Sequence, residues 1–260
     1  MTGSASLLVL ATLAGSPPHR VHTDDFRWHG AIAAGKTLEI IGVNGPIEVS
    51  ASNGPEAEVT AVKRARRSDP ESVTFQVVDH PGGITICAVY PPGHRNQENE
   101  CLPGGKGRMN TQNNDVDVTF TIRVPRGVRF TGRTVNGEIE AHGLTAETEL
   151  YTVNGSIAVE TSSWASARTV NGSITARMGR ADWSDEAEFE TVNGGITLDL
   201  PSNASMQVEA STVNGSMSTD FPLTIRGRWG PRRMSGTIGQ GGRTLALSTV
   251  NGNVELRRAP

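Results

Sequence analysis

Residues that could carry acid–base, nucleophilic or metal chemistry are spread along this chain rather than gathered in motifs. The six histidines stand at positions 19, 22, 29, 80, 94 and 142, and none lies four residues from another. The chain has no HExxH zinc motif, no GxSxG nucleophile elbow and no P-loop. His19 and His22 lie near the N-terminus, where a solvated tail explains them better than a metal site does. We therefore expect no metal site and no cofactor.

Carboxylates are the remaining candidates for catalysis, because glycoside hydrolysis needs two converging carboxyl groups. Many of those in the C-terminal half alternate with apolar residues, as outward-facing positions of strands do. We expect them to form solvated faces that keep sheets from aggregating. Three or more charged residues converging in one cleft would instead favour an enzyme. The carboxylates are Glu138, Glu140, Glu147, Glu149, Glu160, Asp182, Asp185, Glu186, Glu188, Glu190, Asp199, Glu209 and Asp220.

The two cysteines, Cys87 and Cys101, bracket a polar stretch that contains Pro and Gly. Two cysteines in an exported chain most simply form one disulfide. Closing a loop of this size would stabilise the fold by about 3 kcal/mol. A zinc site is the alternative, but His94 and Glu98 inside the loop leave the ligand set incomplete.

Two basic clusters occur, at residues 63–67 (KRARR) and 226–233 (RGRWGPRR). The second mixes arginine with tryptophan and could contact the phosphate of a lipopolysaccharide or an acidic glycan. Alternatively, this second cluster forms the solvated rim of a terminal cap and binds nothing. Its candidate binding residues are Arg226, Arg228, Trp229, Arg232 and Arg233.

The most regular feature of the sequence is the tetrapeptide Thr-Val-Asn-Gly, which occurs six times. Its asparagines stand at 136, 154, 171, 193, 214 and 251, and a looser copy (GVNGPIEV) places another at 44. A period near 20 residues with tolerated changes in length is typical of a repeat architecture. The last step is nearly two periods long and contains GPRRMSGTIGQGGRTLALS, which is either a degenerate copy or a terminal cap.

Two architectures explain the repeat. Asn-Gly could be the two-residue turn of an antiparallel β-meander, with Thr facing the core and Val facing out. Alternatively, Val-Asn-Gly is the bend of a β-solenoid similar to a right-handed parallel β-helix. We favour the solenoid, in which Val and Ile line the interior, Asn forms a ladder and Gly permits positive φ. The corner residues would be Asn44, Asn136, Asn154, Asn171, Asn193, Asn214 and Asn251, with Gly137, Gly155, Gly172, Gly194, Gly215 and Gly252.

The composition agrees with an all-β chain of 260 residues. The sequence patterns divide this chain into three regions. Glycine is abundant, with 30 residues, and the net charge of −3 gives no general attraction to nucleic acid. Residues 1–22 contain a short apolar run of the length of a signal-peptide core, so we expect a signal peptide there; the alternative is a disordered N-terminal tail. We expect a smaller β region with the disulfide loop at 23–125 and the capped repeat domain at 126–260. No segment is apolar enough over its length for a transmembrane helix.

The repeats, the ITICAVYP segment at 84–91, Cys101 and the C-terminal LALSTVNGNVEL together resemble the bacterial DUF4097 family, which is labelled as adhesins. The resemblance covers roughly Thr37 to Leu256. It implies an exported all-β protein whose repeats coil into a solenoid, and it supplies no catalytic residues.

We therefore expect a non-enzymatic, adhesin-like scaffold or binding surface in the periplasm, at the cell surface or outside the cell. The partner would be a cell-surface glycan or an envelope protein, and a monomer is favoured. The alternatives are a polysaccharide-active β-helix enzyme, and a structural or sensory envelope component that binds a protein partner. An exposed apolar or aromatic stripe, formed for example by Trp164 and Trp183, would favour the last of these.

Overall fold

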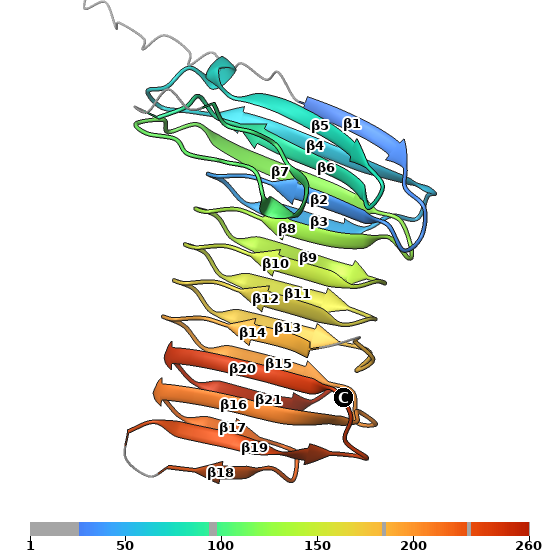
Figure 1. Ribbon diagram of the computed structural model, residues 1–260, viewed down its shortest axis with the longest axis vertical. Helices are drawn as coiled ribbons and strands as arrows, with labels where there is room; N and C mark the ends of the chain where they lie inside the picture. Colours follow the sequence, from blue (N-terminus) through green and yellow to red (C-terminus); the bar gives the residue numbers. More distant parts are fainter. Residues whose placement is uncertain (1–25, 94–97, 184–185, 228–229, 260) are drawn as a thin grey trace, which may run out of the picture.

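The computed structural model describes residues 26–93, 98–183, 186–227 and 230–259. The segment 1–22, the histidines at 19, 22 and 94, and Asp185, Arg228 and Trp229 lie outside these ranges. In the described residues, 21 strands form two long sheets that lie face to face, and within each sheet the strands are stacked one above another along the long axis of the molecule (Figure 1).

Sheet A has ten strands and sheet B has eleven. In spatial order, sheet A contains β1 (Phe26–Ala31), β4 (Glu56–Arg64), β7 (Asp117–Val124), β3 (Ile47–Ala51), β9 (Ile139–Leu144), β11 (Ile157–Thr161), β13 (Ile174–Met178), β15 (Ile196–Leu200), β21 (Val254–Arg258) and β17 (Met217–Thr219). Sheet B contains β18 (Thr224–Arg226), β19 (Arg232–Ile238), β16 (Met206–Asn214), β20 (Thr244–Asn251), β14 (Glu186–Glu190), β12 (Ala165–Arg168), β10 (Thr148–Tyr151), β8 (Arg129–Arg133), β2 (Thr37–Ile41), β6 (Gly83–Val89) and β5 (Thr74–His80).

Each repeat is one coil of a β-solenoid. The chain runs along a strand of sheet B, turns at a Val-Asn-Gly corner and returns along a strand of sheet A. Equivalent strands of neighbouring coils pair in parallel, so the predicted solenoid is confirmed and the hairpin meander is wrong. The stacked coils are β2/β3, β8/β9, β10/β11, β12/β13, β14/β15, β20/β21 and β16/β17.

The core lies between the sheets and consists of columns of aligned side chains. In sheet A, the second residue after each corner glycine is apolar, and these residues pair in register from coil to coil. All of them are buried: Ile47, Ile139, Ile157, Ile174, Ile196, Val254 and Met217. Parallel pairing repeats the same inward position in every coil, which explains why this position is apolar in each copy.

At the corners, threonine faces inward and valine faces outward, contrary to our prediction that valine is buried. The six threonines of the tetrapeptide are at most 6% exposed, whereas Val153, Val170, Val213 and Val250 are 38–42% exposed. Val135 and Val192 are half-buried, and only Val43 is buried. Each threonine hydroxyl donates to the glycine carbonyl of an adjacent coil at 2.8–3.2 Å, a bond that valine could not make.

The asparagines form the ladder that the solenoid architecture requires. Each side-chain Nδ2 donates to Oδ1 of the asparagine in the neighbouring coil at 2.8–2.9 Å. Asn44 lies at the first rung, where its Nδ2 donates to the carbonyls of Asn114 and Val116. The ladder therefore runs through all seven coils and ends at Asn214.

The corner glycines are required by close approach rather than by positive φ, which corrects our expectation. Among them, only Gly45 has a positive φ, of 114°. At the six others, a Cβ would lie 1.8–2.0 Å from a carbonyl oxygen of the glycine in the adjacent coil. Any larger residue would thus force neighbouring coils apart.

The C-terminal end of the solenoid does not follow the order of the sequence. The last pair, β20/β21, is inserted between β14/β15 and β16/β17. The segment of the chain between β17 and β20 contains β18 and β19; β19 pairs antiparallel with β16, and β18 pairs antiparallel with β19. The long last step of the repeat thus holds a terminal cap and not a further copy.

The N-terminal end extends the same two sheets. β6 pairs in parallel with β2, and β7 with β3, so these two strands form an incomplete coil whose corner is replaced by residues 90–116. β5, β4 and β1 then add antiparallel edges, and two short 3-10 helices, η1 (Pro70–Ser72) and η2 (Pro103–Gly105), lie in the connections. The coil β2/β3 packs directly on β8/β9, so both sheets are continuous across residues 125 and 126.

Candidate functional site

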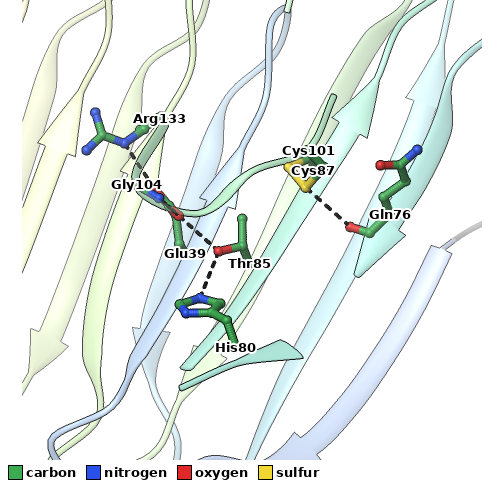
Figure 2. Close-up of a disulfide and its surroundings, with 8 residues drawn as sticks. All are labelled: Glu39, Gln76, His80, Thr85, Cys87, Cys101, Gly104 and Arg133. Carbon is green, nitrogen blue, oxygen red and sulfur yellow. Dashed lines mark hydrogen bonds and ion pairs between the residues drawn. A yellow bond between two sulfur atoms is a disulfide. The ribbon is translucent and has the colours of Figure 1, made fainter. Parts of the chain in front are cut away.

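The disulfide joins Cys87 of β6 to Cys101 in the loop that follows it, with Cα atoms 5.8 Å apart (Figure 2). This bond holds residues 99–109 over the outer face of sheet B. Both cysteines are buried and pack with Ile41 in a small apolar cluster outside the main core. The loop is therefore a cover attached to the sheet at one point by a covalent bond.

A second attachment of this loop is Glu39, an outward residue of β2 that is nevertheless only 5% exposed. Its Oε2 accepts hydrogen bonds from the Gly104 backbone N–H at 2.8 Å and from Thr85 Oγ1 at 3.0 Å, and its Oε1 accepts from Arg133 Nε at 3.1 Å (Figure 2). His80 Nε2 lies 3.2 Å from the Thr85 hydroxyl. A buried carboxylate with three donors is satisfied in place and fixes the loop, so we assign it a structural role.

Tyr90 anchors the other side of the same loop. Its hydroxyl donates to the Val116 carbonyl at 2.9 Å and also lies near the backbone of Asn44, the first rung of the ladder. Burial raises the pKa of this phenol well above its ordinary value. Asn99 adds bonds to the Tyr90 and Asn110 carbonyls. Sequence reasoning missed Glu39 and Tyr90, because only the fold brings their partners together.

A groove of about 660 Å³ lies on the outer face of sheet B beside the cap, and we call it the terminal groove. Its floor carries small side chains, Ala246 and Ser248 of β20 and Ser211 of β16, so the face is hollow there. Charged residues border it: Glu188, Glu209, Arg226 and Arg233. Ser235, Met234, Ala210, Leu247, Gly227 and Pro231 complete the lining.

The register of the strands fixes how these charges face one another. Glu188 and Glu209 stand in one row with Ala246 between them. Arg226 and Arg233 are direct cross-strand partners of β18 and β19, and Arg233 also pairs with Ser211. The groove thus has a carboxylate side and an arginine side joined by serine hydroxyls.

Of the predicted basic rim, Arg226 and Arg233 meet at the terminal groove. Arg232 is half-buried and has the opposite parity on β19, so it does not line the groove. In the other basic cluster, Lys63 is 8% exposed, and its Nζ donates to Glu71 and to the Val73 carbonyl. That lysine holds a connection in place and does not form part of a binding patch.

Most described carboxylates of the sequence prediction lie on the outer faces, and several are in ion pairs. Arg168 pairs with Glu188 and Glu190, and Arg177 pairs with Asp199. Arg129 Nε lies 3.3 Å from Glu147, whose pKa is raised by burial and partly lowered by that arginine. In residues 26–93, 98–183, 186–227 and 230–259, no three His, Cys, Asp or Glu side chains are grouped so that they could hold a metal ion.

Trp164 and Trp183 do not form the exposed stripe that we considered. Trp183 is fully buried and donates from Nε1 to the Thr244 carbonyl at 2.9 Å, and Trp164 is half-buried against the core. The exposed apolar stripe is formed instead by the corner valines, beside the asparagine ladder. No described helix is long and apolar enough to cross a membrane.

Stacked coils, a capped end and a groove on one face define a β-solenoid of the repeat class. The chain belongs to the Toastrack DUF4097 family, whose model matches residues 106–257. No curated protein matches it.

Solved structures similar to the chain include three bacterial proteins. A candidate cell adhesion protein from Clostridium sporogenes is 13% identical, with a TM-score of 0.48, 91% of this chain and 100% of that chain being covered. A candidate adhesin from Bacteroides fragilis is 11% identical, with a TM-score of 0.31 and coverage of 90% and 97%. A candidate lipid-binding protein from Parabacteroides distasonis is 9% identical, with a TM-score of 0.21 and coverage of 91% and 97%.

Proposed function

We propose that this chain is an exported, non-enzymatic binding protein of the bacterial envelope that takes an anionic glycan in the terminal groove. The observation that carries the proposal is the pair Arg226 and Arg233, which are direct cross-strand partners at the edge of a hollow face. Like charges placed opposite each other on a sheet are unfavourable. A phosphate or carboxylate group bound between them would relieve that repulsion with charge-assisted hydrogen bonds.

The rest of the groove suits the sugar. Ser211, Ser235 and Ser248 offer hydroxyls that can both donate and accept, and Glu209 offers an exposed acceptor. The parallel ladder holds these groups on rigid strands, which lowers the entropy that binding must overcome. The shallow shape fits a chain that lies along the face.

The test is a glycan array probed with the full chain, followed by calorimetric titration of a phosphorylated or uronate-containing hit and its neutral counterpart. The double variant Arg226→Gln/Arg233→Gln should lose at least about tenfold in affinity for the anionic form. Arg123→Gln, at an exposed arginine of sheet A, is the matched control and should bind normally. Equal binding of neutral and anionic glycans by the wild type would refute the proposal.

An enzyme is the second candidate, because the terminal groove brings four charged residues into one depression. With Ala246 between them, Glu188 and Glu209 are two strands apart, which places their Cα atoms about 10 Å apart. Inverting glycosidases hold their carboxyl groups roughly 6.5–9.5 Å apart. Against this, Glu188 is occupied by Arg168. Release of reducing ends by the wild type, abolished in Glu209→Gln, would establish the enzyme; we expect no release.

A protein partner is the third candidate, and the exposed valine stripe favours it. The double variant Val153→Thr/Val170→Thr removes the apolar character of the stripe while the inward threonines remain. If an envelope partner binds there, this variant loses the partner and still binds glycan. If glycan binding is the function, the variant behaves as the wild type in both assays.

Export is proposed on the disulfide, since structural disulfides persist in oxidising compartments. Expression of the full chain in a bacterial host, followed by fractionation and thiol labelling, tests it. We expect an unlabelled, oxidised protein outside the cytoplasm. Recovery of a reduced protein from the cytoplasm alone would contradict export.

A further inference from the structure

The asparagine ladder places seven chemically labile Asn-Gly pairs in a row. In such a pair the backbone nitrogen of glycine can attack the side-chain carbonyl carbon of asparagine, because glycine has no Cβ to obstruct it. An eighth pair, Asn53-Gly54, lies in the exposed connection between β3 and β4. The same dipeptide therefore occurs in different surroundings within one chain.

Six of the seven pairs are protected at both reacting groups. The glycine N–H that would attack donates to the asparagine carbonyl of an adjacent coil at 2.8–3.0 Å in Gly45, Gly137, Gly155, Gly172, Gly194 and Gly252. In the same six pairs, the asparagine Oδ1 accepts a bond from the next rung. The glycine nitrogen, which would be the nucleophile, is thus hydrogen-bonded, and the asparagine side-chain amide, which must rotate toward it, is held in place.

The last pair, Asn214-Gly215, lacks both protections because no coil follows it. Its Nδ2 still donates to Asn251 Oδ1 at 2.9 Å, and its carbonyl accepts from Gly252. Within the part of the chain that the structure describes, however, nothing donates to Asn214 Oδ1 and nothing accepts from the Gly215 N–H. Asn214 is also exposed to solvent.

We propose that Asn214 is a site of spontaneous modification, at which the asparagine is converted to aspartate or isoaspartate. The Gly215 nitrogen, after losing its proton to water, bonds to Asn214 Cγ and expels the side-chain nitrogen as ammonia. Water then opens the resulting five-membered imide at either carbonyl. The product carries a new negative charge and has lost the donor to Asn251, so the terminal rung of the ladder is broken.

The experiment ages the folded full chain in mildly alkaline buffer and follows each Asn-Gly peptide by mass spectrometry. Conversion adds about 1 Da, and opening in ¹⁸O water labels the new carboxylate. We expect Asn214 to convert at least roughly tenfold faster than Asn171, since only the latter is held on both sides. Asn53, whose Gly54 N–H bonds only to Ser52 Oγ, serves as an exposed reference within the same sample.

Two controls keep the test decisive. In denaturant, all eight pairs should convert at similar rates, which shows that the fold causes the difference. The variant Asn214→Gln should lose the signal at this position, because ring closure from the longer side chain is much slower. The proposal is overturned if Asn214 in the folded chain converts as slowly as Asn171, or if Asn171 converts as fast as Asn214. Neither result depends on what the terminal groove binds.

Discussion

Three of the four residues of the Thr-Val-Asn-Gly corner each make a different contact with the neighbouring coil. Threonine fills the interior and bonds a carbonyl of the adjacent coil, asparagine bonds the next asparagine, and glycine allows the backbones to approach. A neutral hydrogen bond of this kind contributes about 1 kcal/mol net. Because the contribution recurs at every rung, the corners couple neighbouring coils along the whole solenoid.

The inward threonine is tested by a matched pair of variants in one corner. Thr191→Val keeps the shape but removes the 2.8 Å bond to the Gly172 carbonyl, at a residue that is 1% exposed. We expect the free energy of unfolding to fall by about 1 kcal/mol. Val192→Thr, at the next and half-buried position, should change it by less than about 0.5 kcal/mol. Denaturant titration measures both, and equal effects would contradict the assigned orientations.

The two tyrosines provide a pH test, since burial raises the pKa of both phenols. A raised pKa means that the neutral phenol is favoured in the folded state. Its stabilisation is complete below the unfolded value of about 10 and is lost as pH rises toward the folded value. We expect ultraviolet titration to show Tyr90 ionising only with alkaline unfolding. In Tyr90→Phe the contribution of this phenol to the pH dependence of stability should disappear, so stability should fall less steeply as the pH rises. Titration of both phenols at their ordinary pKa in the folded wild type would disprove the prediction.

At the scale of the elements, stacking is limited by how closely two coils approach. At Gly172 a Cβ would lie 2.0 Å from the Gly155 carbonyl oxygen, which is backbone and cannot move aside alone. At Gly195, which follows the corner of the adjacent coil β14/β15, the nearest atom is the Asn253 carbonyl oxygen at 3.3 Å. A larger side chain at Gly172 would therefore push the coils apart, whereas one at Gly195 would not.

This difference predicts opposite outcomes for two alanine substitutions. Gly172→Ala should destabilise the fold by roughly 1–3 kcal/mol or more, because backbone must shift across two coils. Gly195→Ala should cost less than about 1 kcal/mol. Thermal unfolding followed by circular dichroism compares them. Comparable melting temperatures for the two variants would show that close approach is not what requires glycine at the corner.

The cover loop over sheet B is tested through its disulfide. Removing the bond with Cys87→Ser/Cys101→Ser should lower the free energy of unfolding by about 3 kcal/mol, as expected for a loop of this length. Hydrogen exchange of residues 99–109 should become faster, while the coils from β10 onward keep their protection. Reduced wild type should behave as the double variant, and an unchanged denaturation midpoint would argue against a stabilising bond.

For the whole molecule, the sequence predicts the repeating coil but not the order of the coils. The period, the asparagine ladder and the cap follow from local patterns that recur at fixed spacing. The insertion of β20/β21 does not, because every tetrapeptide can stack on every other and only non-local packing selects the partner. The sequence could not predict the terminal groove for the same reason: Glu188 and Ala246 adjoin only through that insertion. We predicted the wrong orientation for the valines because an alternating pattern shows which residues share a face of the strand, but not which of the two faces points to the core.

The inserted coil makes the C-terminal end depend on the last residues of the chain. Leu247 of β20 is 2% exposed and lies between β14 and β16. Leu247→Ala should cost about 2–5 kcal/mol and should increase hydrogen exchange in residues 206–219 as well as in 244–258. Leu150→Ala in β10 removes an equally buried side chain from a coil that touches neither segment, so it should leave 206–219 protected. If the coils instead stacked in sequence order, residues 206–219 would pair with β14 and would keep most of their protection in Leu247→Ala, and that outcome would contradict the inserted position of β20/β21.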